Sequence, residues 1–281
     1  MIQLPGLDFE SAFNWASDPI EHTILNQMHS QPVVYSYQSI DGLQFELKLR
    51  KNIIRSAKAL NESEAKFETF KNSRCNPDFW HRTNVGGFRL RQDVSPADGI
   101  LDIYKNSSLY GFECATAILI IYYHAVLESI GERLFNQYFQ QLYLYSWHHD
   151  TDLGIQRIQT EYILPGDVVY FNNPDFHPET DWWRGENAVV LEDGMYFGHG
   201  MGITTGERII QSLNQQRRPG GTRSAYLMRS ATRPSFGHLA RITSLSRSFA
   251  PYKVHYPVVH HDRTSLSYTG YLSFLNGVYY S

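Results

Sequence analysis

The sequence predicts an α+β fold in which a buried helix, headed by a cysteine, packs on an antiparallel sheet. Cys114 begins an apolar run that has no proline or glycine over residues 115–130. A helix that is apolar on all sides is normally buried, and this one is too short to span a membrane. The runs NAVVL and MYFGH flank Asp193–Gly194, a strong signal for a β-hairpin and hence for an antiparallel sheet.

Residues 1–40 read as short, irregular pieces, and a long helix is predicted only after them. Residues 17–19, Ser-Asp-Pro, resemble a helix start before IEHTILNQMHS, whereas QPVVYSYQS has the composition of a strand. From Gly42 onward, apolar residues at helical spacing predict a long helix. Most of its charged side chains are expected on a solvated face. These charges are Lys48, Arg50, Lys51, Arg55 and Lys58.

Residues 71–98 are broken by prolines and glycines and read as loops around a short strand, GGFRLR. Cys75 lies in this polar stretch without an acid–base partner nearby in the sequence, so we interpret it as non-catalytic. Ser95–Pro96 predicts the start of a short helix that leads to Cys114.

Beyond Gly131, which is a plausible left-handed helix stop, a second helix, GERLFNQYFQQL, precedes the alternating run YLYSW. The following loop, HHDTDLG, contains two histidines and two aspartates, which raises the possibility of a metal site. Adjacent loop residues seldom converge on one ion, so a solvated polar loop is favoured. No metal site is therefore expected.

The hairpin brings a carboxylate and an imidazole close together if its loop is the two residues Asp193–Gly194. His199 then faces Ala188, and Glu186 is its diagonal neighbour on the same sheet face. A register slip of one residue would undo this arrangement. A preceding strand, ILPGDVVYF, enters the same sheet through a tight turn.

The C-terminal third continues with a helix capped by Thr204 or Thr205 and ended by a Pro-Gly pair, a strand or turn in SAYLMRSATR, and a closing GHLARI. We expect a single catalytic domain over residues 1–241. Residues 242–281 form an extension of unknown role, with strand-like fragments YPVVHH and SYTGYLSF.

Composition narrows the functional class. The chain has 281 residues, a net charge of −3 and two cysteines, so neither nucleic acid nor an anionic membrane is an expected partner, and no disulfide framework is expected. The N-terminal residues carry acids where a signal peptide has basic and apolar regions. Synthesis and retention in a reducing cytoplasm are therefore expected.

Cys114 is the candidate nucleophile. At a helix N-terminus, the helix dipole and free N–H groups can lower a thiol pKa well below its usual value of about 8.5. The alternative is a small buried apolar residue, which many lone cysteines are. The cysteine-headed helix, the PGDVVYF strand and the hairpin resemble the papain-like core of NlpC/P60 peptidases. This sequence differs from them because Glu186 occupies the position of the usual histidine.

A glutamate of ordinary pKa, about 4.3, is a poor base for a thiol. Burial among aromatic residues raises a carboxyl pKa and brings the two groups closer. Trp147, Trp182 and Trp183 are candidates for that apolar wall. The pair could rest as thiol and carboxylate or as thiolate and carboxylic acid, and the sequence does not decide between them.

Over residues 1–241 the sequence is similar to the bacterial spore-coat protein-glutamine γ-glutamyltransferases, the Bacillus-type transglutaminases. The runs that carry the resemblance include YGFECATAILIIYYHA, GDVVYFNNPDF, WWRGENAVVL and YFGHGMGI. The resemblance implies that Cys114 forms a γ-glutamyl thioester and that Glu186 is its principal acid–base partner. It implies that Glu113 partly substitutes for Glu186 and that His199 completes the site.

The same resemblance implies that Trp147 and Trp183 line a substrate tunnel and that Asn187 contributes to substrate binding. It implies that neither calcium nor another cofactor is needed and that the substrates are spore-coat proteins with Gln and Lys side chains. It also implies a monomer that is made in the sporulating mother cell and then deposited in the spore coat. The alternatives are a cysteine peptidase or amidase of the NlpC/P60 kind and an inactive coat protein. Glu113 could instead only complement the helix dipole, and His199 could be a core histidine.

Overall fold

The computed structural model describes residues 2–4, 13, 16, 18–244, 253 and 258–279. Its α-helices are α2 (Pro19–Ser30), α3 (Ile40–Glu62), α4 (Pro96–Lys105), α5 (Cys114–Ile130), α6 (Glu132–Tyr138), α7 (Gly206–Gln215), α8 (Phe236–Ser244) and α9 (Tyr268–Tyr279). The 3-10 turns are η1 (Phe70–Asn72), η2 (Ser107–Leu109), η3 (Thr151–Leu153), η4 (Pro178–Arg184) and η5 (Glu192–Gly194).

The strands fall into one large sheet and three small ones. The large sheet contains β8 (Gln156–Gln159), β9 (Val168–Asn172), β10 (Gly185–Val190), β11 (Met195–Gly198), β12 (Gly202–Thr205) and β13 (Tyr226–Arg233). The small sheets contain β1 (Ile2–Gln3), β2 (Tyr35–Ser36), β3 (Lys66–Phe67), β4 (Trp80–Arg82), β5 (Phe88–Leu90), β6 (Gly111–Phe112) and β7 (Tyr143–Leu144).

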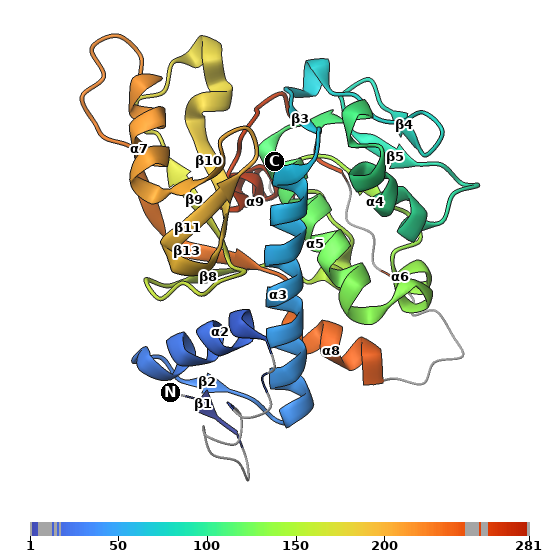
Figure 1. The fold of residues 1–281 in the computed structure, drawn as a ribbon. Helices are drawn as coiled ribbons and strands as arrows, with labels where there is room; N and C mark the ends of the chain where they lie inside the picture. The colour runs from blue at the N-terminus through green and yellow to red at the C-terminus, as the bar shows by residue number, and fades with distance from the viewer. Residues whose placement is uncertain are drawn as a thin grey trace.

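The large sheet is antiparallel throughout, in the order β12-β11-β10-β9-β13-β8 (Figure 1). Its side chains alternate between two cores. Val168 and Val189 face the main core with α3 and α5, whereas Val169 and Ala188 face a second core with α7. The sheet therefore separates α7 from the cysteine-headed helix.

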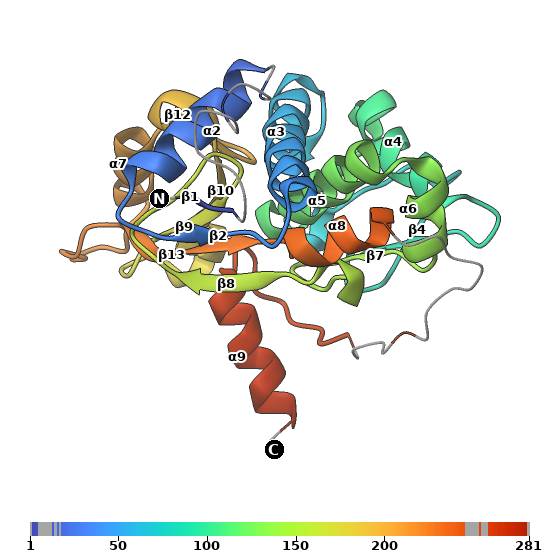
Figure 2. The same cartoon turned by 90° about the horizontal axis from the view of Figure 1, so that it is seen from below.

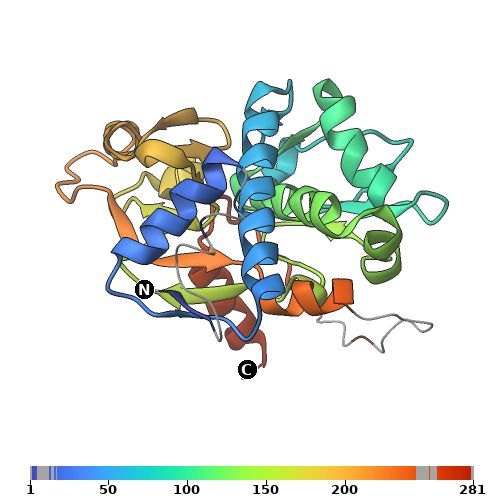
Figure 3. The same cartoon turned by 60° about the horizontal axis from the view of Figure 1, so that its bottom comes forward.

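Helix α3 crosses the centre of the molecule between the large sheet and the α4–α6 layer (Figure 3). It packs along α5, which is buried over almost its whole length as its apolar sequence predicts. Gly131, with a φ of 81°, ends α5. The predicted buried helix on an antiparallel sheet is confirmed.

Predicted capping residues begin three other helices. The side chain of Asp18 accepts a hydrogen bond from the backbone N–H of Ile20 (3.0 Å), and Ser95 accepts one from Asp98 (3.1 Å). Of the two threonines proposed for α7, Thr205 is the cap. Each side chain satisfies an N–H group that lacks a partner within the helix.

One of the charges placed on a solvated face of α3 lies in the core. Arg50 is completely buried, donates to Glu46 (2.8 Å) and Asp167 (2.9 Å), and lies 4.6 Å from the ring centroid of Phe236. The solvated-face prediction holds for Arg55, whose side chain is 58% exposed. Helical spacing alone could not identify Arg50, because its partner Asp167 comes from the turn before β9.

The β10–β11 hairpin has a three-residue loop rather than the predicted two. Ala188 pairs with Gly198, so the predicted pairing of Ala188 with His199 is wrong by one residue. Glu192 joins the loop because both Asp193 (φ 56°) and Gly194 (φ 71°) take left-handed conformations. His199 consequently follows the end of β11.

The C-terminal fragment SYTGYLSF, read as strand-like, forms part of helix α9, which extends away from the large sheet in Figure 2. Tyr268 and Tyr271 enter the main core, and Leu272 and Leu275 pack against it. This is the i, i+3, i+4, i+7 spacing of a helix face, so the strand prediction is wrong. Among the described residues, no helix combines the length and apolarity needed to cross a membrane.

Candidate active site

Cys114 is the first residue of α5 and is wholly buried. Asn187, on β10, donates its Nδ2–H to the Cys114 sulfur at 3.3 Å. The thiol in turn lies 3.9 Å from Oε2 of Glu113, within the reach of a sulfur hydrogen bond. Helix α5 and strand β10 thus bring together three residues that the sequence assigns to the site.

Glu113 is the N-cap of α5. Its carboxyl accepts hydrogen bonds from the backbone N–H groups of Ala115 (2.9 Å) and Thr116 (2.7 Å) and from the Thr116 hydroxyl (2.8 Å). Burial raises the pKa of Glu113, and these hydrogen bonds oppose the increase. The carboxyl is therefore held in one orientation beside the thiol.

Glu186, at the start of β10, is also buried, and burial followed by the nearby Glu113 charge raises its pKa well above the usual value. The backbone N–H of His199 donates to its carboxyl and opposes that increase. Among the described residues, Oε1 of Glu186 has no hydrogen-bond partner. Glu186 is thus the less constrained of the two carboxyls.

Gly198 gives the Glu186 side chain its space. A Cβ at position 198 would lie 2.7 Å from Oε1 and 2.9 Å from Cγ of Glu186. Because Glu186 is buried, these atoms have little room to move away. The lack of a side chain at Gly198 therefore leaves the space that the Glu186 carboxyl occupies.

We expect Gly198→Ala to displace Glu186 and reduce kcat by about tenfold, since misplacing a reacting group by 1 Å costs up to about a hundredfold. Kinetics with thermal denaturation in parallel would test this. Gly194→Ala in the same hairpin is the control, because its Cβ meets nothing within 4 Å; its positive φ (71°), which Gly198 does not have, makes it report backbone strain without a clash. Equal activity losses in both variants would contradict the assignment to Glu186.

The pKa of Cys114 is raised, not lowered as its helix position suggested. Burial is the main cause, followed by the negative charges of Glu186 and Glu113, while the polar side chains of Ser265 and Asn187 beside the sulfur partly offset it. Desolvation outweighs the effect of the helix N-terminus here because the Cys114 thiol is completely buried. The structure therefore favours a resting neutral thiol.

His199 meets the Glu186 carboxyl through its backbone N–H rather than through its ring. Its ring stacks on Phe112 with centroids 4.7 Å apart, and burial lowers its pKa to about 4. The imidazole is therefore neutral at physiological pH. Within the described residues its Nε2 has no hydrogen-bond partner.

The predicted tunnel tryptophans lie in different surroundings. Trp147 is completely buried, and its Nε1–H donates to the carbonyl oxygen of Leu266 at 2.8 Å. The same oxygen accepts from Asn187 Nδ2, also at 2.8 Å. Trp183, in η4, instead packs against the second core beside α7.

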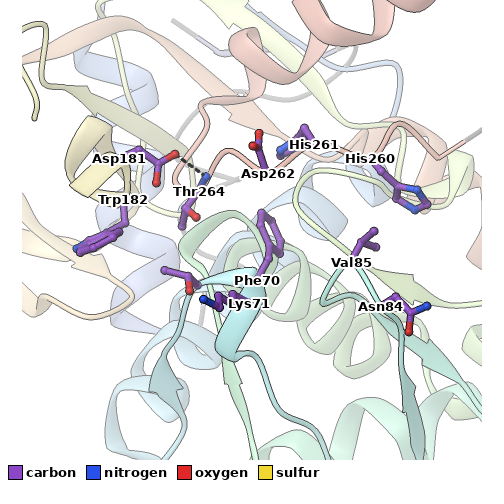
Figure 4. Close-up of a pocket in the computed structure, with 11 residues that line it drawn as sticks. Phe70, Lys71, Asn84, Val85, Asp181, Trp182, His260, His261, Asp262 and Thr264 are labelled. Carbon is purple, nitrogen blue, oxygen red and sulfur yellow. Dashed lines mark hydrogen bonds between the residues drawn. The ribbon is translucent and has the colours of Figure 1, made fainter. Parts of the chain in front are cut away.

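A cavity of about 580 Å³ has Thr264, the neighbour of Ser265 in the sequence, on its lining (Figure 4). Its lining comes from η1, the loop between β4 and β5, η4 and the segment at residues 260–264. Trp182 lies on this lining, and Asp181 accepts a hydrogen bond from the backbone N–H of Thr264 at 3.3 Å. The C-terminal segment thus forms one wall of the cavity.

The sequence interpretation missed the residues that cover the thiol. Ser265 is completely buried and its side chain lies close enough to the Cys114 thiol to influence its pKa, and the Tyr170 hydroxyl donates to the Ser265 carbonyl at 2.9 Å. Nothing in the local sequence links residues 264–266 to Cys114, from which they are separated by about half of the chain. Among the described residues, no group of three or more His, Cys, Asp or Glu side chains is placed to hold a metal ion.

Comparisons with known proteins agree on one family. A family model described as protein-glutamine gamma-glutamyltransferase matches residues 1–243. A protein of that name from Halalkalibacterium halodurans is 49% identical over 280 residues, 99% of each chain. Its counterpart from Bacillus subtilis is 43% identical over 229 residues, covering 82% of this chain and 93% of the relative.

Among solved structures, a transglutaminase from Geobacillus stearothermophilus without its C-terminal extension matches with a TM-score of 0.70 and 49% identity. The match covers 73% of this chain and 99% of that structure. The similar fold, the family match over residues 1–243 and the relative aligned over 99% of each chain agree. The chain therefore belongs to the protein-glutamine gamma-glutamyltransferase family of acyltransferases.

Proposed function

We propose that the chain transfers the γ-glutamyl group of protein-bound glutamine to the amine of protein-bound lysine, forming an isopeptide crosslink and releasing ammonia. One observation carries this proposal. The N–H groups of Asn187 and Trp147 converge on a single carbonyl oxygen, at 2.8 Å each, and Asn187 also contacts the Cys114 sulfur. This arrangement suits a glutamine carboxamide whose carbonyl carbon faces the thiol.

In the first half-reaction, the Cys114 sulfur attacks the carboxamide carbon as the thiol proton passes to Glu186. Asn187 and Trp147 stabilise the negative oxygen of the tetrahedral intermediate, as oxyanion-hole donors do. The C–N bond then breaks, and the leaving nitrogen takes the proton from Glu186. Ammonia leaves and a γ-glutamyl thioester remains on Cys114.

In the second half-reaction, a neutral lysine amine attacks the thioester carbon and gives a proton to Glu186. The C–S bond breaks, and the thiol recovers that proton. A free lysine is mostly protonated at neutral pH, since its usual pKa is about 10.4, so transfer competes with hydrolysis only where water is excluded. The apolar indole of Trp147, which is completely buried beside the site, supports transfer by excluding water.

Glu186 rather than Glu113 is assigned the proton transfers. The carboxyl of Glu113 is held by three hydrogen bonds as the N-cap of α5, whereas one oxygen of Glu186 has no partner among the described residues. A raised pKa makes the ionised Glu186 a stronger base than an ordinary carboxylate. Glu113 positions the thiol, and His199 positions Glu186 through its backbone N–H.

The wider assignment follows the family. We propose a papain-like catalytic unit over residues 1–241, with residues 242–281 as an extension. The substrates are coat proteins with accessible Gln and Lys side chains, and the monomeric enzyme is made in the mother cell and deposited in the spore coat. No cofactor takes part, and Trp147 lines the path of the substrates.

Incorporation of a fluorescent primary amine into a glutamine-rich protein, with calcium chelated, tests the function. Wild type is expected to label the acceptor covalently, whereas Cys114→Ala is not. A folded wild type that fails to label but cleaves cell-wall muropeptides would overturn the transferase and support the alternative, a cysteine peptidase or amidase. Ammonia release measured in the same reaction separates amide chemistry from nonspecific labelling.

A further inference from the structure

We propose that residues 264–266 occupy the place of the substrate glutamine and act as a built-in block, so that the C-terminal segment must leave before substrate reaches Cys114. The inference concerns the same thiol as the proposed function and goes beyond it, because it assigns a role to the extension. It predicts two states of the full-length chain, of which the structure shows the closed one.

The block uses the contacts that a substrate needs. The Leu266 carbonyl accepts hydrogen bonds from the side-chain N–H groups of Asn187 and Trp147, the two donors assigned to the substrate carbonyl. The preceding carbonyl, that of Ser265, accepts a hydrogen bond from the Tyr170 hydroxyl at 2.9 Å. A substrate and this segment therefore cannot bind at the same time.

The segment also seals the thiol from solvent. Thr264 is 2% exposed, Ser265 is completely buried, and Cys114 beneath them is completely buried. A lysine side chain and a protein-bound glutamine both have to reach the sulfur, so a chain locked in this state could not turn over.

The segment is a block rather than a substrate. Residues 242–281 contain no glutamine, so the extension has no γ-carboxamide that could acylate Cys114 and release ammonia. It presents a backbone carbonyl instead. Occupying the site without reacting is the behaviour expected of an intramolecular inhibitor.

Contacts on both sides hold the blocking residues in place. Before them, His261 bonds to Ser146 (3.1 Å) and its backbone N–H donates to the Tyr145 hydroxyl (3.0 Å). After them, the Tyr268 hydroxyl donates to the Ile155 carbonyl (3.1 Å), and its ring lies 5.2 Å from that of Trp147. The segment is therefore docked at the site by specific contacts.

The backbone at Ser265 offers a selective way to open the block. Ser265 has a φ of 56°, a left-handed conformation that is unfavourable for a residue other than glycine. Its backbone N–H also donates to the Glu113 carboxyl. Proline cannot take this φ and has no N–H, whereas glycine adopts the same φ readily and keeps the N–H.

The test compares Ser265→Pro with Ser265→Gly in the full-length chain. The readout is the rate at which iodoacetamide alkylates Cys114, followed by peptide mass spectrometry. We expect Ser265→Pro to raise this rate by about tenfold or more, because the apparent rate follows the open fraction. Ser265→Gly should stay within about twofold of wild type, because it retains the closed backbone.

Cys75 is the internal reference, since it is half-buried outside the site. Equal rates of Cys114 alkylation in wild type and Ser265→Pro would overturn the block. An equal rise in the alkylation of Cys114 and Cys75 would also overturn it, because a rise at both cysteines reports general unfolding. Amine incorporation is measured on the same samples. A rise in alkylation without any amine incorporation would support the block and reject the transferase function.

Discussion

Glu186→Gln is expected to lower kcat/KM for amine incorporation by about 10²- to 10⁴-fold, the usual contribution of a general acid–base group. Glutamine preserves the shape of the side chain but cannot accept the thiol proton or the proton of the incoming amine. Both half-reactions pass a proton through this carboxyl, so both should slow. Single-turnover formation of the thioester, followed by mass spectrometry, would measure the first step separately.

Glu113→Gln is the matched control, because it makes the same change in the neighbouring buried carboxyl. Glu113 caps α5, so this variant should lose about 1 kcal/mol of stability, as expected for a lost N-cap. Its activity should fall less than that of Glu186→Gln. Equal and mild losses of activity in the two variants would show that the carboxyls share the proton transfers.

The pH dependence gives a second test of Glu186. Its pKa is raised by burial, so the acidic limb of kcat/KM should lie above pH 4.5, the ordinary value for a glutamate, and should disappear in Glu186→Gln. A carboxyl whose pKa is raised by folding stabilises the fold fully only below its unfolded pKa. That stabilisation is lost as the pH rises through the folded pKa.

The stability of Glu186→Gln relative to that of wild type should therefore be higher at pH 8 than at pH 4. The ionised form of Glu186 carries a desolvation cost that glutamine lacks. Thermal denaturation of both proteins at the two pH values measures this difference. An identical difference at both pH values would contradict the raised pKa.

The sequence predicted the parts of the molecule that local patterns encode. The apolar run after Cys114 predicted the buried helix α5, and capping residues such as Asp18 and Ser95 predicted helix starts. The β10–β11 hairpin was predicted correctly, but its register was predicted wrongly by one residue. Whether the loop has two or three residues depends on the backbone conformation of Asp193. An aspartate can adopt the left-handed conformation but does not require it, so the sequence does not determine the register.

The sequence could not predict contacts between distant segments. The pKa of Cys114 follows from burial under residues 264–266, and no motif in that extension suggests that it reaches the thiol. Arg50 is a second example, because a helical pattern shows only which residues share a face. Whether a charge on that face meets solvent or a buried carboxylate depends on the turn at Asp167.

Arg50→Met is expected to reduce the free energy of unfolding by about 3–5 kcal/mol, the cost of breaking a buried ion pair by removing one partner. Arg50 is completely buried and links α3 to the turn before β9 through Asp167 (2.9 Å) and the Pro165 carbonyl (3.0 Å). Methionine fills much of the volume but leaves the completely buried Asp167 with Arg233 as its remaining charge partner.

Arg55→Met on the same helix is the control, because the ion pair of Arg55 with Asp18 (2.7 Å) is at the surface and should contribute at most about 1 kcal/mol. Urea denaturation of both variants, with equal m-values, gives the comparison. Arg50→Lys should not restore the loss, because an ammonium cannot reproduce the fixed donor geometry toward Glu46, Asp167 and the carbonyl. Similar losses in Arg50→Met and Arg55→Met would mean that the buried network contributes no more than a surface pair, and that α3 is held to the sheet by apolar packing alone.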